Sequence, residues 1–463
     1  MFAAPPRPVI TIVGGGFAGT SLALQLAWQP GPLAVDIELI EPRPVPGPGL
    51  AYGPQRPEYL LNVRPGALSL RPDEPRHFAN WLAAQPESVS GPPEFASRAT
   101  YGRYLHENLA AVLNQTQPNG SRLRWHNQTV LAAPFLPQEG QRAVQLADGQ
   151  VLRSDYVVLA LGNFAPPPPA GPDLRYLTHP GYHADPWAPN LLESIGPDET
   201  VLLIGSGLTA VDVLLGLQQA GHRAPITVVA RHGRWPAVHG PVEAAYPNFS
   251  AELMGLRVGE LLRIVRRRMG EAAQEGIDWR PVLDALRPDT GRLWAAWPLA
   301  EQARFLRHLA GIWAVSRHRS PPQNAMAIMA LEAAGRLRVR VGRVTEISPC
   351  GDELRVRAGA DPSGALRAQH VICCVGPLLD YHRIQAPLVR DLRTSGALTP
   401  DPLGLGILTD EHGALLDAAG VASPNLFTLG ASRRPAFFES TAVPELRQQA
   451  STLAAELARH VSR

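Results

Sequence analysis

A glycine-rich turn between a buried strand and a helix is the feature that most constrains the fold of this chain. Residues 9–13 form a continuous apolar run typical of a central parallel strand, and Gly14, Gly16 and Gly19 follow it with G-x-G-x-x-G spacing. A Leu/Ala-rich helix pattern comes next, and a second apolar strand pattern then ends at Glu41. Such glycines allow a tight turn and close approach of the backbone to a pyrophosphate, while the acid suits a ribose hydroxyl. The segment therefore predicts a dinucleotide-binding unit.

The same arrangement recurs further along the chain with a different ending. Residues 201–204 form an apolar strand pattern, and Gly205, Gly207 and Ala210 repeat the spacing with a small third residue. The strand that follows ends at Arg231, where an acid is usual. A guanidinium at this place can pair in bidentate fashion with the adenosine 2′-phosphate of NADPH, which a carboxylate would repel. The unlike strand ends predict FAD in the first unit and NADPH in the second. The alternative interpretation is that Arg231 is a solvated loop arginine with no part in binding.

Composition removes several other classes of protein. The chain contains no lysine, so all 43 basic residues are arginine, which excludes Schiff-base lysine chemistry and the phosphate-loop lysine of nucleoside triphosphatases. A net charge of +2 gives no reason to expect a nucleic-acid partner. The three cysteines form no C-x-x-C pair, and we expect no metal. With no secretory signal pattern and no apolar span of about 18 residues, we expect a cytoplasmic protein without a membrane partner.

These patterns predict an α/β protein with two Rossmann-like dinucleotide-binding domains, each a doubly wound parallel sheet, and a helical insertion. A run of four prolines follows a buried strand that ends at Gly162, and a last strand and helix near the C-terminus complete the first domain. The expected boundaries are 1–172 with 378–463 for the discontinuous FAD domain, 173–377 for the NADPH domain, and 237–335 for the insertion within it.

The insertion shows apolar residues at i, i+3 and i+4, as in amphipathic helices. Over residues 298–319 this pattern predicts amphipathic helical structure whose inward-facing residues are Leu299, Phe305, Leu306, Leu309, Ile312 and Trp313. We expect its four tryptophans to pack the insertion, and in the alternative interpretation one or two of them line a substrate cavity: Trp279, Trp294, Trp297 and Trp313.

The motifs "GLAYG", "LLNV" and "STAVPELRQQA" give the chain a family resemblance over nearly its whole length. It resembles the two-dinucleotide-binding flavoproteins, especially flavin-containing and Baeyer–Villiger-type monooxygenases, and more narrowly the bacterial FAD/NAD(P)-binding proteins related to them. The linker contains His183-x-x-x-Trp187, which is similar to half of the Baeyer–Villiger fingerprint F-x-G-x-x-x-H-x-x-x-W. Leu177 and His179 stand where its Phe and Gly would be, which puts ketone oxygenation in doubt. The alternative interpretation is a proline-bounded loop with a packed tryptophan.

The resemblance also implies site residues. It would put Asn62, Arg64 and Gly66 near the flavin or the nicotinamide. In the last flavin strand, where the family normally has Gly-Asp, this chain has Gly430-Ala431. Contact with the ribityl phosphate would then come from the backbone or from Arg433. The catalytic side chains stay unassigned, with Arg64, His183 and Arg433 as candidates. The expected cofactor-binding residues are Gly14, Gly16, Phe17, Ala18, Gly19, Glu41, Arg43, Asn62, Val130, Gly162, Gly205, Gly207, Leu208, Thr209, Ala210, Arg231, Gly430, Ser440 and Thr441.

The leading functional hypothesis is an NADPH-dependent, FAD-containing monooxygenase. It would oxygenate a small organic substrate with O₂ through a C4a-(hydro)peroxyflavin, so that the cofactor carries the chemistry. One alternative is an FAD-dependent oxidoreductase that passes electrons from NAD(P)H to a quinone, a carrier or an imine without oxygenation. Another is a non-catalytic flavin-binding sensor. The sequence leaves the substrate open, and a homo-oligomer is compatible with it.

Overall fold

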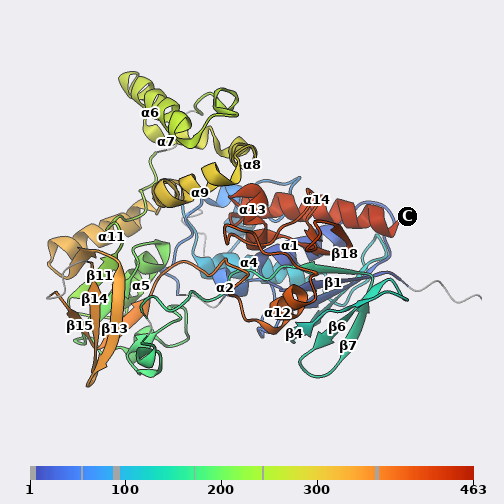
Figure 1. The fold of residues 1–463 in the computed structure, drawn as a ribbon, viewed down its shortest axis with the longest axis horizontal. Coiled ribbons are helices and arrows are strands. Elements are labelled where there is room, and N and C mark those ends of the chain that lie inside the picture. The colour runs from blue at the N-terminus through green and yellow to red at the C-terminus, as the bar shows by residue number, and fades with distance from the viewer. Residues whose placement is uncertain are drawn as a thin grey trace, which may run out of the picture.

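The computed structural model describes residues 7–53, 56–86, 94–171, 173–241, 245–359 and 364–462. Its centre is a six-stranded sheet in which every neighbouring pair is parallel except the edge strand β17. The sheet takes strands from both ends of the chain, because the C-terminal β18 lies beside β8 (Figure 1). The strand order is β17 (Ala414–Leu416), β18 (Ala422–Thr428), β8 (Tyr156–Leu159), β1 (Val9–Val13), β2 (Asp36–Ile40) and β3 (Arg122–His126).

Each face of this sheet buries a separate apolar core. Side chains such as Ile12 and Leu39 face the helices α1 (Phe17–Ala27), α4 (Arg98–Ala110) and α14 (Val443–Val461). Their neighbours Val13 and Ile40 point to the opposite face, because strand side chains alternate. That face is covered by α12 (Pro387–Thr394) and by a small antiparallel sheet of β4 (Val130–Ala132), β5 (Phe135–Leu136), β6 (Gln141–Leu146) and β7 (Val151–Ser154).

A second, wholly parallel sheet has five strands. Their order is β12 (Leu337–Val341), β11 (Ile226–Ala230), β10 (Val201–Ile204), β16 (His370–Cys373) and β9 (Tyr182–His183). Helices α5 (Leu208–Gln219) and α11 (Pro322–Ala333) cover one face. The antiparallel sheet of β13 (Val344–Cys350), β14 (Glu353–Ala358) and β15 (Leu366–Ala368) covers the other. Two parallel sheets with helices confirm the predicted fold class.

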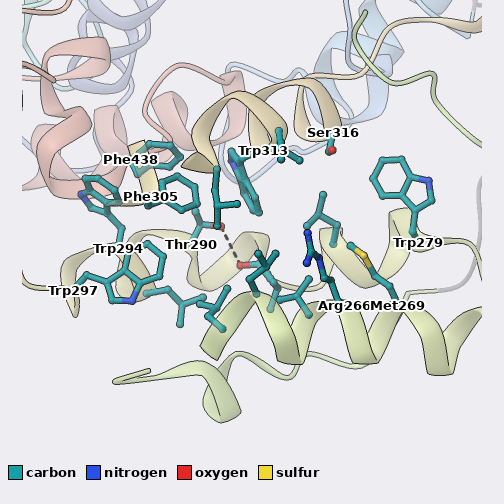
Figure 2. A pocket seen from close by; sticks show the side chains of 18 residues that line it. Arg266, Met269, Trp279, Thr290, Trp294, Trp297, Phe305, Trp313, Ser316 and Phe438 are labelled. Carbon is teal, nitrogen blue, oxygen red and sulfur yellow. Dashed lines mark hydrogen bonds between the residues drawn. The ribbon is translucent and has the colours of Figure 1, made fainter. Parts of the chain in front are cut away.

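The helical insertion projects from these sheets (Figure 1). It consists of α6 (Val258–Gln274), α7 (Trp279–Asp284), α8 (Thr290–Ala295), α9 (Leu299–His308) and α10 (Ala310–Arg317). The amphipathic segment 298–319 forms two successive helices, α9 and α10, which are divided at Leu309. Phe305 is buried as expected, but Leu299 is half exposed. The helices of the insertion surround an apolar cavity (Figure 2).

Three shorter helices lie in the first half or near the C-terminus: α2 (Gly49–Tyr52), α3 (His77–Ala83) and α13 (Arg434–Phe437). In the described part of the chain, no helix is both long enough and apolar enough to cross a bilayer. The expected domain boundaries stay a prediction, and residues 1–6, 172 and 463 at those boundaries lie outside the described residues.

Candidate functional site

The first glycine turn lies at the carboxyl end of β1 and is sterically closed on one side. Gly14 has φ of +108°, and a Cβ there would collide with the carbonyl of Ala160 at the end of β8. A Cβ at Gly19 would collide in turn with the carbonyl of Gly14. Both positions therefore require glycine, and the turn brings the start of α1 directly onto the sheet edge.

The start of α1 offers unprotected backbone donors. Gly16 is its N-cap, without a side-chain cap, so the amides of the first turn that includes Phe17 and Ala18 are free of a side-chain acceptor. Such amides and the helix dipole favour a phosphate. The "GLAYG" motif forms α2 across this turn, since a Cβ at Gly49 would lie 2.7 Å from Cα of Gly16. The close approach therefore requires glycine at position 49, where φ is +60°.

Glu41 stands beside the turn, at the end of β2, and is almost fully buried (1% exposed). The amide of Gly15 donates to its Oε2 at 2.9 Å. Arg43 donates to its Oε1 from both the amide and the guanidinium Nη1, each at 3.0 Å. A buried carboxylate so held is already oriented for a ribose hydroxyl at this edge.

Other predicted residues gather at the same edge. Gly162 follows β8, and Gly430 follows β18. Gly430 packs close to α1, since an added Cβ would lie 3.4 Å from the Ala18 methyl. The amide of Gly430 donates to Oε1 of Gln449 at 3.0 Å. Val130 is buried against residues of β1 and β2. The segments that follow β1, β2, β8 and β18 thus lie together at the carboxyl edge of the first sheet.

Ser440 provides a direct test of whether this edge fits a ligand. It is fully buried, and its hydroxyl has no hydrogen-bond partner within the described residues. An unpartnered buried hydroxyl is costly, which favours a ligand atom as the missing partner. Together with the glycine cradle, it fits a nucleotide cofactor. The neighbouring Thr441 is exposed.

Arg433 lies behind the edge and is 3% exposed. Its Nη2 donates to the carbonyls of Asp410 at 3.1 Å and Glu411 at 2.9 Å, and the guanidinium lies 4.7 Å from the ring centre of Phe437. Burial lowers the pKa of Arg433 to about 10. The side chain ties the loop before β17 to the end of β18, and its Nε has no partner in the described structure.

The second glycine turn repeats this geometry at the carboxyl end of β10. Gly205 has φ of +107°, and a Cβ would lie 2.7 Å from the carbonyl of Cys374. Gly207 caps α5 without a side chain, and nothing lies within 4 Å of an added Cβ. The space over the helix N-terminus is therefore open. The first residues of α5 are Leu208, Thr209 and Ala210.

Arg231 comes directly after β11 and is exposed. In the part of the chain that the structure describes, its side chain makes no hydrogen bond or ion pair. The hydroxyl of Ser206, within the glycine turn, donates to the carbonyl of Arg234 at 2.7 Å. This bond holds the loop of Arg231 beside the turn, where its free guanidinium can meet a phosphate.

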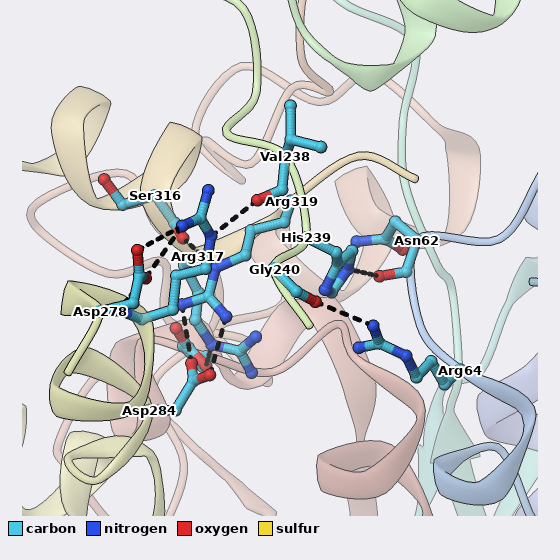
Figure 3. A network of polar contacts seen from close by, with 12 residues as sticks. Asn62, Arg64, Val238, His239, Gly240, Asp278, Asp284, Ser316, Arg317 and Arg319 are labelled. Carbon is cyan, nitrogen blue, oxygen red and sulfur yellow. Dashed lines mark hydrogen bonds and ion pairs between the residues drawn. The ribbon is translucent and has the colours of Figure 1, made fainter. Parts of the chain in front are cut away.

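Residues 62–64 connect the two halves of the molecule (Figure 3). Nε2 of His239 donates to the carbonyl of Asn62 at 3.0 Å, and Arg64 Nη2 donates to the carbonyl of Gly240 at 3.1 Å. Burial lowers the pKa of His239, so it is neutral near pH 7. A cleft of about 470 Å³ opens here against α7. His239 could not be predicted from the sequence, since a single loop histidine has no distinguishing pattern. Arg64 also pairs with Glu94 at 2.8 Å.

His183 lies elsewhere. Its Nε2 is 3.0 Å from Nδ1 of His370, whose Nε2 is 2.9 Å from Oε2 of Glu199. Burial, with a smaller contribution from His370, lowers the pKa of His183 to about 4. His370 and Glu199 mark the amino ends of β16 and β10, opposite the glycine turn. The structure therefore separates His183 from the other candidates. Trp187 packs edge-on against Tyr59, with 5.6 Å between ring centres.

No group of three His, Cys, Asp or Glu side chains that could hold a metal ion occurs among the described residues. The two parallel sheets, each with a glycine turn and an uncapped helix at its carboxyl edge, define a protein with two dinucleotide-binding domains.

Comparison with known proteins supports this assignment to the dinucleotide-binding proteins. Residues 11–164 match the model of a family described as FAD-NAD(P)-binding. No curated protein sequence matches the chain. The predicted resemblance to the two-dinucleotide-binding flavoproteins is confirmed at the level of the fold.

Among solved structures, the ornithine N-hydroxylase of Kutzneria sp. 744 aligns over 98% of this chain and 99% of its own, with 14% identity and a TM-score of 0.65. The cadaverine monooxygenase of Erwinia amylovora, solved with FAD, covers 99% and 95% with 15% identity and a TM-score of 0.66. The L-lysine 6-monooxygenase of Pseudomonas syringae covers 98% and 100% with 19% identity and a TM-score of 0.65. At these identities the likeness establishes the shared fold.

Proposed function

We propose that this protein is an NADPH-dependent, FAD-containing monooxygenase that oxygenates a small organic substrate with O₂. The observation that carries the proposal is the pair of unlike strand ends: a buried Glu41 at the first glycine turn and, at the second, an exposed Arg231 with no partner among the described residues. Support also comes from solved FAD-dependent and NADP-bound monooxygenases that share the fold along nearly the full length of the chain.

The first edge would hold FAD. The α1 amides would bind the pyrophosphate, Glu41 would accept from the ribose, and the unpartnered hydroxyl of Ser440 would contact the flavin end. When bound, FAD supplies the redox chemistry and the activation of O₂. This assignment corresponds to the predicted FAD domain of residues 1–172 and 378–463.

The second edge would hold NADPH, with α5 on the pyrophosphate and Arg231 on the 2′-phosphate. The contact of Asn62 and Arg64 with residues 239–240 places the first domain against the loop after Arg231. These residues would orient the nicotinamide toward the flavin and exclude water between them.

Three absorbance measurements on the purified protein test the proposal. We expect an oxidised flavin spectrum, which NADPH bleaches under nitrogen at far lower concentration than NADH. On mixing the reduced protein with O₂ in a stopped-flow instrument, we expect a transient species before the oxidised spectrum returns.

Direct return to the oxidised spectrum, with electrons passing equally well to a quinone dye in the presence or absence of O₂, would instead identify an electron-transferring oxidoreductase. Bound flavin that no reduced nucleotide bleaches would identify a sensor. Colourless protein after reconstitution with FAD would contradict the whole proposal.

A further inference from the structure

The helical insertion encloses an apolar cavity that the nucleotide edges do not use. It measures about 320 Å³, within the range of small-molecule sites. Helices α6 and α7 form one wall, and α8, α9 and α10 form the rest. All four tryptophans of the insertion line it, more than the one or two of the alternative interpretation: Trp279, Trp294, Trp297 and Trp313.

One residue from the first domain closes an end of this cavity (Figure 2). Phe438 belongs to the segment between Arg433 and Ser440, at the edge assigned to the flavin. Its ring stacks on Trp294 with 4.8 Å between centres and meets Phe305 edge-on at 5.1 Å. The residue that closes the cavity is therefore only two positions along the chain from Ser440, whose hydroxyl has no partner among the described residues.

Ion pairs and hydrogen bonds fix this junction. Glu439 accepts from the indole of Trp313 at 2.8 Å and from Nε of Arg317 at 3.2 Å. Arg287 pairs with Glu445 at 2.8 Å, near the start of α14. The Arg317–Glu439 pair is largely buried and the Arg287–Glu445 pair partly so, and both join the insertion to the segment beside the flavin edge.

The cavity wall is apolar because its polar atoms are already bonded elsewhere. The indole N–H groups of Trp294 and Trp297 donate to the carbonyls of Pro435 and Leu256, each at 2.8 Å. The Thr290 hydroxyl donates to a backbone carbonyl at 3.1 Å. The rings therefore present carbon to the interior.

Charge is nearly absent from the lining. Among the described residues that line the cavity there is no carboxylate, and Arg266 is the one ionised side chain, exposed at the end near Ser316 and Trp279 (Figure 2). Glu439, behind Trp313, is already paired with Arg317. A positively charged amine would therefore lose its hydration and meet no carboxylate in the lining, which is strongly unfavourable.

We propose that this cavity binds the substrate of the monooxygenase, and that the substrate is an uncharged apolar molecule rather than an amine. The inference rests on the proposed function and adds the chemical class of the substrate. It separates this chain from the ornithine, lysine and cadaverine enzymes that share its fold, whose named substrates are amines. The apolar body would lie between the tryptophans, with its reacting end toward Phe438.

Binding to the FAD-loaded protein tests this class directly. Octan-2-one, octylamine and octanoate are matched in chain length and differ in charge, and tryptophan fluorescence and calorimetry report binding without turnover. We expect a Kd for octan-2-one at least tenfold below that of octylamine and below that of octanoate. Equal or tighter binding of either ion would overturn the proposal.

Two matched variants locate the site. Ile312 lines the cavity from α10 and is 43% exposed, so Ile312→Asp is tolerable for folding and adds a carboxylate to the wall. Met326 on α11 is 62% exposed and does not line the cavity. We expect Ile312→Asp to weaken octan-2-one binding at least tenfold and Met326→Asp to leave it unchanged. Equal effects of the two variants would overturn the assignment.

The flavin spectrum keeps the two proposals apart. If FAD binds and NADPH bleaches it while octan-2-one fails to bind, only the substrate class is wrong. If no flavin binds, the proposed function itself fails.

Discussion

Asp212 in α5 and Arg98 at the start of α4 form an ion pair between the two domains, with Oδ2 and Nε 3.2 Å apart. Asp212 is almost fully buried. The guanidinium also lies 5.9 Å from the ring centre of Trp187, and that ring meets Tyr59. These residues, far apart in the sequence, thus form one contact between the first and the second domain.

This junction predicts a pH dependence of stability. Burial raises the pKa of Asp212 to about 6, although Arg98 opposes the shift. The folded state then binds a proton more tightly than the unfolded chain, whose aspartates have pKa near 3.9. Stability from this group is full below about pH 4 and is lost as pH rises through 6, by about 2–3 kcal/mol.

Denaturant unfolding of the wild type and Asp212→Asn between pH 4 and 7 measures this effect. The difference in unfolding free energy between the two proteins should change over this range by about 2 kcal/mol. Parallel pH profiles would show that Asp212 titrates normally.

Arg231 should determine nucleotide preference. Its guanidinium is free in the described structure, so Arg231→Ala removes a charge-assisted phosphate contact worth about 1.5–3 kcal/mol. The Kd for NADPH should rise roughly ten- to a hundredfold, while that for NADH changes little. Arg263→Ala, an exposed arginine on α6, is the control. Equal losses for both nucleotides would remove Arg231 from this role.

Gly14 should tolerate no side chain. Because a Cβ would strike the Ala160 carbonyl at a φ of +108°, Gly14→Ala should lower the free energy of unfolding by at least about 2 kcal/mol and abolish flavin binding. Flavin absorbance per protein and thermal unfolding give both values. Gly270→Ala, in open space on α6, should gain about 0.5–1 kcal/mol and keep its flavin. Flavin retained by Gly14→Ala would place the cofactor elsewhere.

Glu41 should act on flavin affinity. Glu41→Gln keeps the shape of the side chain but removes the negative charge that strengthens the hydrogen bonds donated to it by the Gly15 amide and by Arg43. Titration of the apoprotein with FAD should show affinity reduced roughly tenfold or more.

Glu38 on the same strand provides the matched control. It is buried and bonds Arg124 and His126 rather than the glycine turn. Glu38→Gln should reduce stability while FAD affinity stays near wild type. The reverse pattern would contradict the assignment of Glu41.

His183 should contribute little to catalysis. A pKa of about 4 keeps it neutral near pH 7, and its bond to His370 lies at the amino ends of the second sheet. His183→Asn should leave the rate and pH profile of NADPH oxidation within about twofold of wild type, a change of less than about 0.5 kcal/mol. A rate loss beyond tenfold would return His183 to the catalytic candidates.

Much of each nucleotide edge is predictable from the sequence because its interactions are local. Gly14, Glu41 and Gly205 lie within strand–turn–helix units whose spacing dictates the turn, and the structure places them at the carboxyl ends of the strands. His183 was harder to place, since its environment comes from His370 and Glu199 on neighbouring strands. The missed His239 likewise depends on a carbonyl at residue 62.

The sequence by itself determined the two dinucleotide-binding units and their unlike ends, because a G-x-G-x-x-G turn and its following strand are set by neighbours along the chain. Only the tertiary structure decided that Phe438 closes a cavity of the insertion and that Asp212 meets Arg98. Those contacts join segments more than a hundred residues apart, where packing and burial select the partner and no local pattern records it.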